Sequence, residues 1–174
     1  MTEVQRIIGI DNGLDGGIVS LCPDGAVLRA DVMPTVKLGK RRQYDLVTLA
    51  DLFNYAAHHT RCAVFIEQSK PMPRVMKGVT GAWSSGYTFG IAIGMLAALR
   101  ISYTVVRPQE WQRAMFAGLP ADATTKQKSV IVAQRLWPSV DWTRSERATK
   151  AHDGMTDAAL IAEAGRRSLG TGVV

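Results

Sequence analysis

Acidic residues stand at three places along the chain where carboxylates can do chemistry. Asp11 ends an apolar run and directly precedes a glycine-rich turn, and Glu67 ends a second apolar run. Asp153 and Asp157 are four residues apart in an expected helix, so their side chains share one face. Carboxylates at strand ends and on one helix face can converge on a single site.

Converging carboxylates repel one another and stay ionised only when positive charge lies close by. Mg²⁺ is a hard cation that prefers oxygen ligands, and two such ions about 4 Å apart can activate a water molecule and stabilise the leaving oxygen of a phosphodiester. Taken singly, the acids have simpler explanations as a turn former, a solvated strand end and a helix cap. Their combination favours phosphodiester hydrolysis with Mg²⁺, for which we expect Mn²⁺ to substitute.

The elements that must position these acids follow from the apolar periodicity of the chain. The first three expected strands are joined by short turns and form an antiparallel meander, whereas the continuous apolar run before Glu67 is typical of a parallel strand buried on both faces. The expected strands are residues 6–10, 18–22, 26–33, 62–66 and 102–106. The expected helices are residues 45–58, 85–99, a short helix from Pro108, 124–136 and 153–169. This order predicts an α/β fold with a mixed five-stranded sheet flanked by helices.

The composition is that of a globular protein with an excess of positive charge. The 174 residues suit a single domain spanning 1–174, and the formal net charge of +6 favours a polyanionic partner such as nucleic acid or a membrane surface. Cys22 and Cys62 fit neither a metal-ligand spacing nor a disulfide framework, and we expect buried free thiols. The N-terminus has no expected signal peptide, and the longest apolar run, residues 89–99, is too short to span a bilayer. We therefore expect a cytoplasmic protein that has no membrane-spanning segment.

Basic residues gather in four segments between the acidic positions. Solvated surface charge is the simplest explanation for any one segment, but their number favours contacts with phosphates. Two segments are expected loops, residues 37–42 and residues 69–81, and the second is rich in proline and glycine. The basic residues are Lys37, Lys40, Arg41 and Arg42; Lys70, Arg74 and Lys77; Lys126 and Lys128; and Arg144, Arg147 and Lys150. Lys126, Lys128 and Lys150 are candidates for stabilising a scissile phosphate.

Three segments resemble the motifs of RuvC-type Holliday junction resolvases, which belong to the RNase H-like superfamily. Residues 8–17 are similar to the first motif, a strand followed by Asp-x-Gly-x-x-Gly, and residues 64–68 resemble the second. Residues 152–160 resemble the C-terminal motif, in which two acids on a helix complete the metal site. The order of the intervening residues 87–99 and 106–111 also matches, so the resemblance covers nearly the whole chain, with the phage-borne branch nearest.

The resemblance implies an RNase H-like fold and a structure-selective endonuclease that resolves four-way DNA junctions in recombination, in the bacterial host cytoplasm if a phage encodes it. It implies paired symmetric hydrolysis with two divalent metal ions per active site. The acids that would hold these ions are Asp11, Glu67, Asp153 and Asp157. It also places the loop after Glu67 at the junction centre. Candidates to wedge or stack against unpaired bases there are Met72, Met76 and Trp83.

The chain departs from the family pattern at two positions. Many relatives have proline after the first acid, where this chain has Asn12, and we expect this difference to alter turn stiffness rather than chemistry. The family often places its last two ligands three residues apart, but Gly154 stands three before Asp157. Asp153, four before, can face the same site. Some relatives use a histidine near this point, which makes His152 a further candidate.

The expected substrate predicts a homodimer. Two symmetric nicks in a four-way junction call for two active sites, and the chain has one set of carboxylates, so two chains related by a two-fold axis are needed. Gly86, Gly90 and Gly94 line one face of the expected helix 85–99 and would let two copies approach closely. Packing of this face on the protein's own sheet is the alternative.

Three other functions compete with this interpretation. An actin-like phosphotransferase also uses Asp-x-Gly-x-x-Gly, but it needs a second lobe that this chain is too short to hold. A nuclease of the same fold that acts on RNA or on other branched DNA would share the metal site. A non-catalytic nucleic-acid-binding module is disfavoured because it has no need to hold four carboxylates together.

Overall fold

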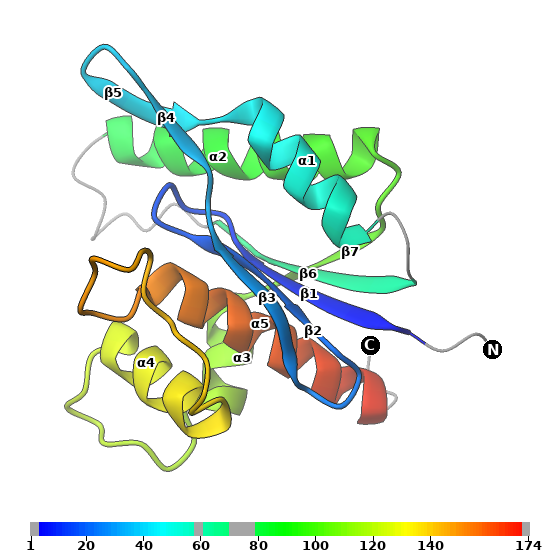
Figure 1. Cartoon of the computed structure of the whole chain (residues 1–174), viewed down its shortest axis with the longest axis vertical. Helices are drawn as coiled ribbons and strands as arrows, with labels where there is room; N and C mark the ends of the chain where they lie inside the picture. Colours follow the sequence, from blue (N-terminus) through cyan, green and yellow to red (C-terminus); the bar gives the residue numbers. More distant parts are fainter. Residues whose placement is uncertain (1–3, 58–60, 70–78, 172–174) are drawn as a thin grey trace.

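A five-stranded mixed sheet forms the centre of the protein. The structure, a computed structural model, describes residues 4–57, 61–69 and 79–171. The strand order is β3-β2-β1-β6-β7 (Figure 1). β1 pairs antiparallel with β2 and parallel with β6, β2 pairs antiparallel with β3, and β6 pairs parallel with β7. The strands are β1 (Arg6–Asp11), β2 (Gly17–Leu21), β3 (Val27–Val32), β6 (Cys62–Glu67) and β7 (Tyr103–Val106). The predicted meander with added parallel strands is therefore confirmed.

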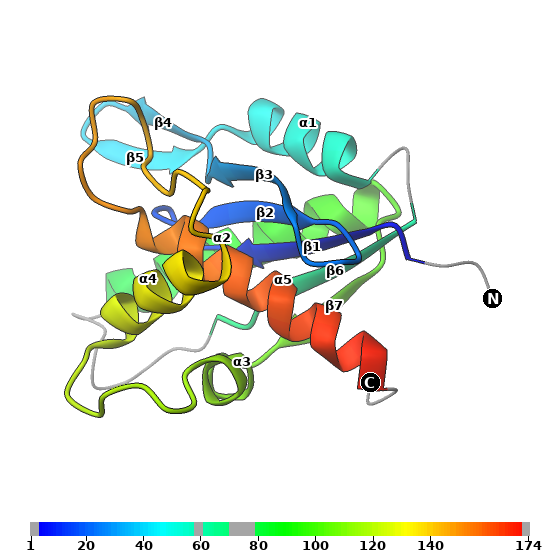
Figure 2. The ribbon, with the colours of Figure 1, turned by 60° about the horizontal axis from the view of Figure 1, so that its bottom comes forward.

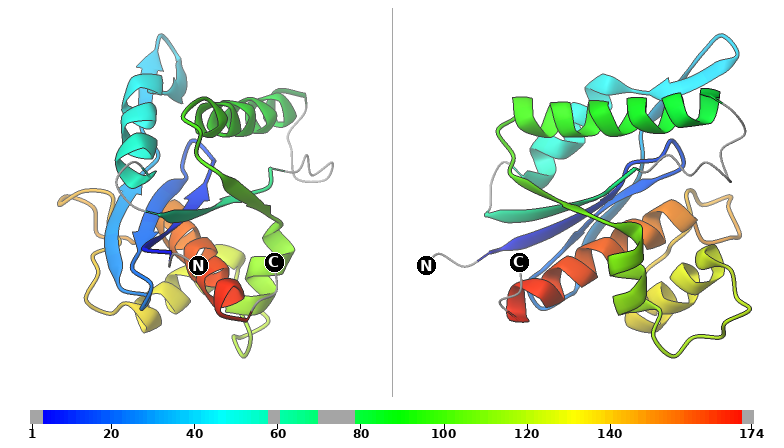
Figure 3. Two further views of the ribbon diagram at one scale, coloured as in Figure 1. Left: turned by 90° about the vertical axis from the view of Figure 1, so that its right-hand side faces the viewer. Right: turned by 180° about the vertical axis from the view of Figure 1, so that it is seen from behind.

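Helices cover both faces of this sheet (Figure 3). One face carries α1 and α2, and the other carries α3, α4 and α5 (Figure 1). Because β1 is buried on both faces, its side chains alternate between two cores, with Ile8 and Ile10 on the α1–α2 side and Ile7 on the α5 side. The helices are α1 (Leu46–Ala57), α2 (Val79–Ala98), α3 (Pro108–Met115), α4 (Thr125–Leu136) and α5 (Asp153–Thr171). Within the described ranges, no helix is long and apolar enough to cross a membrane.

Helix α5 lies unusually close to the sheet because glycines face it. A Cβ atom on Gly9 would lie 2.0 Å from the Ala158 carbonyl oxygen, and one on Gly17 would lie 2.8 Å from the Gly154 carbonyl oxygen. Neither strand position therefore tolerates a side chain while α5 stays in place. Figure 2 shows α5 running across the sheet, with its first turn at the end where the β1–β2 turn lies. The glycines thus fix where that first turn sits.

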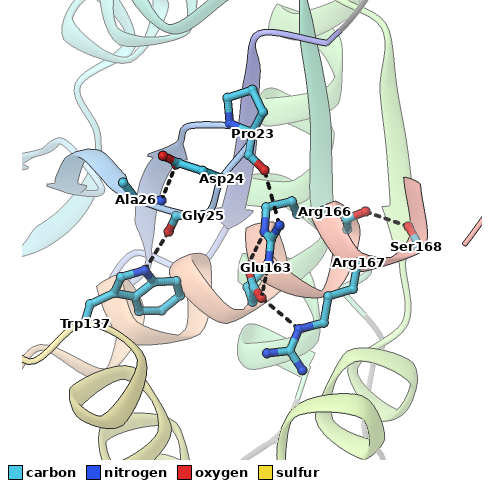
Figure 4. A network of polar contacts seen from close by, with 10 residues as sticks. Pro23, Asp24, Gly25, Ala26, Trp137, Glu163, Arg166, Arg167 and Ser168 are labelled. Atoms are coloured by element: carbon cyan, nitrogen blue, oxygen red, sulfur yellow. Dashed lines mark hydrogen bonds and ion pairs between the residues drawn. The ribbon is translucent and has the colours of Figure 1, made fainter. Parts of the chain in front are cut away.

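A polar network holds the opposite end of α5 (Figure 4). Glu163 is 3% exposed and accepts hydrogen bonds from Arg166 at 2.7 and 2.9 Å and from Arg167 at 2.7 Å. These arginines hold the pKa of Glu163 below its usual value, although burial alone would raise it. The Trp137 indole nitrogen donates to the Gly25 carbonyl at 2.7 Å. The network joins α4, α5 and the β2–β3 turn, far from the first turn of α5.

Three expectations from the sequence need correction. Helix α2 begins at Val79, inside the expected loop over residues 69–81 and six residues before the expected helix start, so Trp83 belongs to this helix rather than to the loop. The expected basic loop over residues 37–42 is a β-hairpin, made of β4 (Thr35–Leu38) and β5 (Arg41–Tyr44), which pair antiparallel in a sheet of their own. The two cysteines are free as expected, but both are half-buried rather than fully buried.

Candidate active site

The sheet brings the first two acids to the same edge. β1 and β6 are parallel neighbours with Ile10 opposite Ile66, so Asp11 and Glu67 end adjacent strands at adjacent positions. The first turn of α5 meets this edge through a backbone bridge between Gly16 and Gly154. All four predicted acids are therefore carried to one end of the molecule by β1, β6 and α5.

Three of these carboxyl groups influence one another electrostatically. Burial, together with the charges of Glu67 and Asp153, raises the pKa of Asp11 to about 7. Burial and the charge of Asp157 raise the pKa of Glu67 to about 7. Burial and the charges of Asp11 and Asp153 raise the pKa of Asp157 to about 7. Such mutual effects require the side chains to lie near one another, which supports their prediction as one cluster.

Asp153 differs from the other three because it has a cationic partner. Its Oδ2 forms an ion pair with Nζ of Lys126 from α4. Burial would raise the pKa of Asp153, but the hydrogen bond and charge of Lys126 hold it below its usual value. Lys126 also lowers the pKa values of Asp11 and Asp157, although it does not outweigh burial there. Of the three predicted phosphate-binding lysines, Lys126 thus contacts the acidic cluster itself.

Gly154 stands in the helix where the family often has a ligand, and its surroundings explain the difference. A Cβ atom on Gly154 would lie 2.0 Å from the Asp15 carbonyl oxygen and 2.6 Å from the Gly16 Cα atom. The backbone of the β1–β2 turn occupies the space that a side chain would need. Asp153, one residue earlier, is the carboxylate nearest to this position on the first turn of α5.

His152 has a structural role at the start of α5. Its Nδ1 accepts a hydrogen bond from the Met155 backbone nitrogen at 3.3 Å, and the residue is 9% exposed. Burial lowers the pKa of His152. The accepting Nδ1 satisfies one of the free N–H groups of the first helical turn, so the histidine caps the helix that carries Asp153 and Asp157.

Asn12 connects three elements around the acids. Its side-chain nitrogen donates to the Glu67 backbone carbonyl at 2.5 Å, and its side-chain oxygen accepts from Ser69 Oγ at 2.8 Å. The Tyr44 hydroxyl donates to the Asn12 backbone carbonyl. Asn12 is 2% exposed, so these bonds are shielded from water. The residue therefore does more than alter turn stiffness: it ties the end of β1 to the end of β6 and to the hairpin.

Trp111 orients the second acid. Its indole nitrogen donates to Glu67 Oε1 at 2.8 Å, and this bond partly offsets the effect of burial on the pKa of Glu67. Sequence reasoning quoted Trp111 within a matching segment but gave it no role, and it missed Tyr44 and Ser69 altogether.

Two cavities open beside the acids. One has a volume of about 610 Å³ and includes Asp11 and Glu67 in its wall, with uncharged polar side chains around them. The other, of about 760 Å³, is lined by Lys126, Lys150 and Asp153. Lys150 thus shares a cavity wall with Asp153, whereas within the described ranges no ion pair joins Lys128 to the acids. Other predicted residues lie outside the described residues: Lys70, Met72, Arg74, Met76 and Lys77.

The donor set fits a divalent cation. Within the described part of the chain, no three acidic, histidine or cysteine side chains are already arranged as a metal site. However, Asp157 Oδ1 is a buried oxygen without a hydrogen-bond partner. The pKa values of Asp11, Glu67 and Asp157 are also raised because hydrogen bonds and Lys126 compensate their charged forms only in part. A hard cation would supply both the missing partner and the missing charge.

Comparisons with known proteins connect this fold to solved structures. No family model matches the sequence, and no curated protein matches it. A structure of Thermus thermophilus RuvC in complex with a Holliday junction substrate is similar, with a TM-score of 0.66, 15% identity and 97% of each chain covered. A second T. thermophilus RuvC structure has a TM-score of 0.57 at 15% identity, with 97% of each chain covered. The yeast mitochondrial Holliday junction resolvase Ydc2 has a TM-score of 0.61 at 16% identity, covering 96% of this chain and 80% of that one. The chain therefore has the RNase H-like fold of the RuvC-type resolvases.

Proposed function

We propose that this chain is a structure-selective endonuclease that resolves four-way DNA junctions by paired symmetric hydrolysis of phosphodiesters. The observation that carries the proposal is the convergence of Asp11, Glu67, Asp153 and Asp157 at one sheet edge. The shared fold with resolvases from T. thermophilus and yeast supports the choice of substrate. We infer a single nuclease domain over residues 1–174 that acts in the cytoplasm.

The four acids would hold two Mg²⁺ ions per active site, and Mn²⁺ would substitute. Bound in this way, the ions supply a nucleophilic water and stabilise the leaving oxygen. The chain's own groups orient the ligands: Trp111 fixes one Glu67 oxygen and Asn12 fixes the backbone at Glu67. Lys126, already at the acids, is placed to meet a scissile phosphate.

DNA binding would use the basic residues around this end of the protein. Lys126 and Lys150 line the cavity that also contains Asp153, so a strand in that cavity would meet both lysines beside the acids. The remaining candidates proposed to bind DNA are Lys128, Lys70, Arg74 and Lys77. Phosphate contacts of this kind give affinity without base specificity.

A homodimer would supply the second active site, and α2 is the proposed interface. A Cβ atom on Gly86, Gly90 or Gly94 would meet no heavy atom within 4 Å. This glycine face therefore does not pack on the described part of the protein's own sheet. Instead, Thr88, Ala92 and Leu96 are the buried residues among the described side chains of α2. The open glycine face leaves room for a second helix.

The experiment that tests the function is cleavage of a synthetic four-way junction in Mg²⁺, with linear duplex and an RNA–DNA hybrid beside it. We expect the junction to be cut and the other two substrates to be cut much more slowly. Preferential cleavage of the hybrid would instead assign the same metal site to an RNA-directed nuclease. No cleavage of any substrate would favour a non-catalytic binding module.

A further inference from the structure

The β4–β5 hairpin is a two-stranded ribbon that forms no ladder with the central sheet. Its strands pair with Lys37 opposite Arg42 and Leu38 opposite Arg41. Gly39 adopts a φ of 61°, as the first central residue of a two-residue type II′ turn requires. Figure 1 shows the hairpin at the end of the molecule that also carries the β1–β2 turn and the start of α5. The ribbon therefore projects beside the candidate active site.

The hairpin concentrates positive charge. Residues 33–44 include four basic residues and no acidic one, and all four basic side chains are exposed. Arg42 pairs with Asp15 of the β1–β2 turn at 2.6 Å. Among the described residues, Lys37, Lys40 and Arg41 form no ion pair, so their charges are free to meet an external anion.

The base of the hairpin, where β5 ends at Tyr44, is linked by hydrogen bonds to the strand ends that carry the acids. Tyr44, at the end of β5, is 1% exposed and donates its hydroxyl hydrogen bond to the Asn12 carbonyl. Asn12 follows Asp11 and holds the Glu67 backbone at 2.5 Å. Arg42 adds a second link through Asp15. A ligand on the hairpin would therefore be held at a defined position relative to the carboxylates.

We propose that the β4–β5 hairpin binds the phosphate backbone of a duplex arm of the DNA whose strand lies at the carboxylates. The inference rests on the proposed function and adds a second contact surface to it. Each strand of the ribbon has four residues and is about 13 Å long at about 3.3 Å per residue, so the ribbon can extend along several phosphates of a duplex. Duplex DNA carries one negative charge per about 1.7 Å of axis, so several phosphates lie within reach of Lys40 in the turn and Arg41 on the outer face.

The outer face of the ribbon also carries side chains suited to contact with a DNA backbone. Tyr44 and Arg42 point toward the protein, so Arg41 and its cross-strand neighbour Leu38 point away from it. Leu38 is 59% exposed and offers an apolar surface to sugar carbons beside the basic groups. Pairing of two hairpins from two copies is disfavoured, because it would bring like charges together.

The test compares two double variants that each remove two positive charges. Lys40→Gln with Arg41→Gln changes the hairpin, and Arg100→Gln with Arg135→Gln changes exposed arginines after α2 and at the end of α4. Affinity for a four-way junction is measured over a salt series in Ca²⁺. The hairpin variant should lose affinity on the order of tenfold at physiological salt and reduce the slope of log K against log salt by about 2. The control pair should bind like the wild type.

Two further measurements identify the contact. A charge-conserving exchange, Lys40→Arg with Arg41→Lys, should retain the wild-type slope. Junctions with arms too short to reach the hairpin should bind the wild type and the hairpin variant equally, because they lack the arm phosphates that the hairpin is proposed to contact.

The inference is overturned if the hairpin variant matches the control pair, or if its loss of affinity accompanies a change in oligomeric state by sedimentation. If the wild type cuts junctions and the hairpin variant binds them with wild-type affinity, the hairpin contact is refuted but the proposed function is not. Wild-type protein that neither binds nor cuts junctions would refute the proposed function, and the hairpin inference with it.

Discussion

Lys126 in α4 forms an ion pair with Asp153 in the first turn of α5. The two residues come from helices that cover the same face of the sheet (Figure 2). The pair places the protein's own cation at a cluster of acids whose charges are otherwise only partly compensated. The pKa of Asp153 is therefore held below its usual value, whereas Asp11, Glu67 and Asp157, with pKa values of about 7, are only partly ionised near neutral pH.

Asp153→Asn tests whether this residue is a ligand or only the partner of Lys126. As a ligand, its loss should abolish cleavage while junction binding is retained, because the other acids still face the DNA. Lys126→Gln is the comparison variant, since it breaks the same ion pair and leaves every carboxylate in place, while it also removes the lysine proposed to meet the scissile phosphate. It should retain some cleavage at high Mg²⁺. Normal cutting by Asp153→Asn would show that Asp153 is not a ligand and that Gly154 marks a different metal geometry.

The raised pKa values predict how the metal-free protein responds to pH. Asp11, Glu67 and Asp157 each have a folded pKa of about 7, and unfolded carboxyls titrate near pH 4. Between these values the folded state binds more protons, so the free energy of unfolding falls as pH rises from about 4 through 7. In thermal melts without metal, this contribution lowers the melting temperature between pH 5 and pH 8.

Asp157→Asn isolates this effect from the other titrating groups. The variant should be more stable than the wild type at pH 8 without metal and should gain less from added Mg²⁺. The difference between the two proteins should shrink toward pH 5. A difference that is constant with pH would contradict the burial of an ionisable Asp157 within the cluster.

Gly154→Ala should destabilise the protein and impair the site. The new methyl group would overlap the backbone of the β1–β2 turn, and such overpacking costs about 1–3 kcal/mol. Gly170→Ala is the control in the same helix, because a Cβ atom there meets no atom within 4 Å. It should stabilise by up to about 1 kcal/mol. Equal stability of the two variants by denaturant unfolding would refute the close contact of α5 with the turn.

Gly90→Leu tests the proposed dimer interface. The leucine would project from the open glycine face of α2 and block close approach of a second helix, while the fold itself has room for it. Sedimentation should therefore detect a dimer for the wild type and a folded monomer for Gly90→Leu. Ala114→Leu, on the exposed surface of α3, should remain dimeric. If Gly90→Leu remained dimeric, the dimer interface would have to lie outside the glycine face of α2. If the wild type were monomeric and still nicked both strands, no dimer would be needed for cleavage.

Much of the site was predictable because strand ends carry positional information. An apolar run that ends in an acid places that acid at a sheet edge, and the parallel pairing of β1 with β6 brings Asp11 to Glu67. The sequence pattern also predicts a mixed sheet and the presence of all five helices, but it places the start of α2 at residue 85 rather than at Val79. The expected elements showed that these acids could converge, and the resemblance to RuvC-type resolvases implied that they form one metal site.

The remaining features depend on contacts between distant residues. Tyr44 and Asn12 are 32 positions apart, and the residues between them carry no periodicity that indicates their hydrogen bond. The hairpin was missed because its strands have four residues each and its turn, Gly39–Lys40, is set among basic residues. In the sequence, Gly154 stands where the family often has a metal ligand. Only the packing of α5 against the β1–β2 turn explains why a glycine is needed at this position.

The most direct test of the central claim is metal-dependent cleavage of a four-way junction by the wild type and by Asp11→Asn, Glu67→Gln and Asp157→Asn. With Mg²⁺ or Mn²⁺ the wild type should give paired symmetric nicks, and with Ca²⁺ it should bind without cutting, because looser coordination serves the reaction poorly. Each variant should bind the junction as tightly as the wild type or more tightly and should not cut it. Full wild-type cleavage in excess chelator, or normal cleavage by these variants, would contradict the assignment of the four acids as a metal-dependent nuclease site.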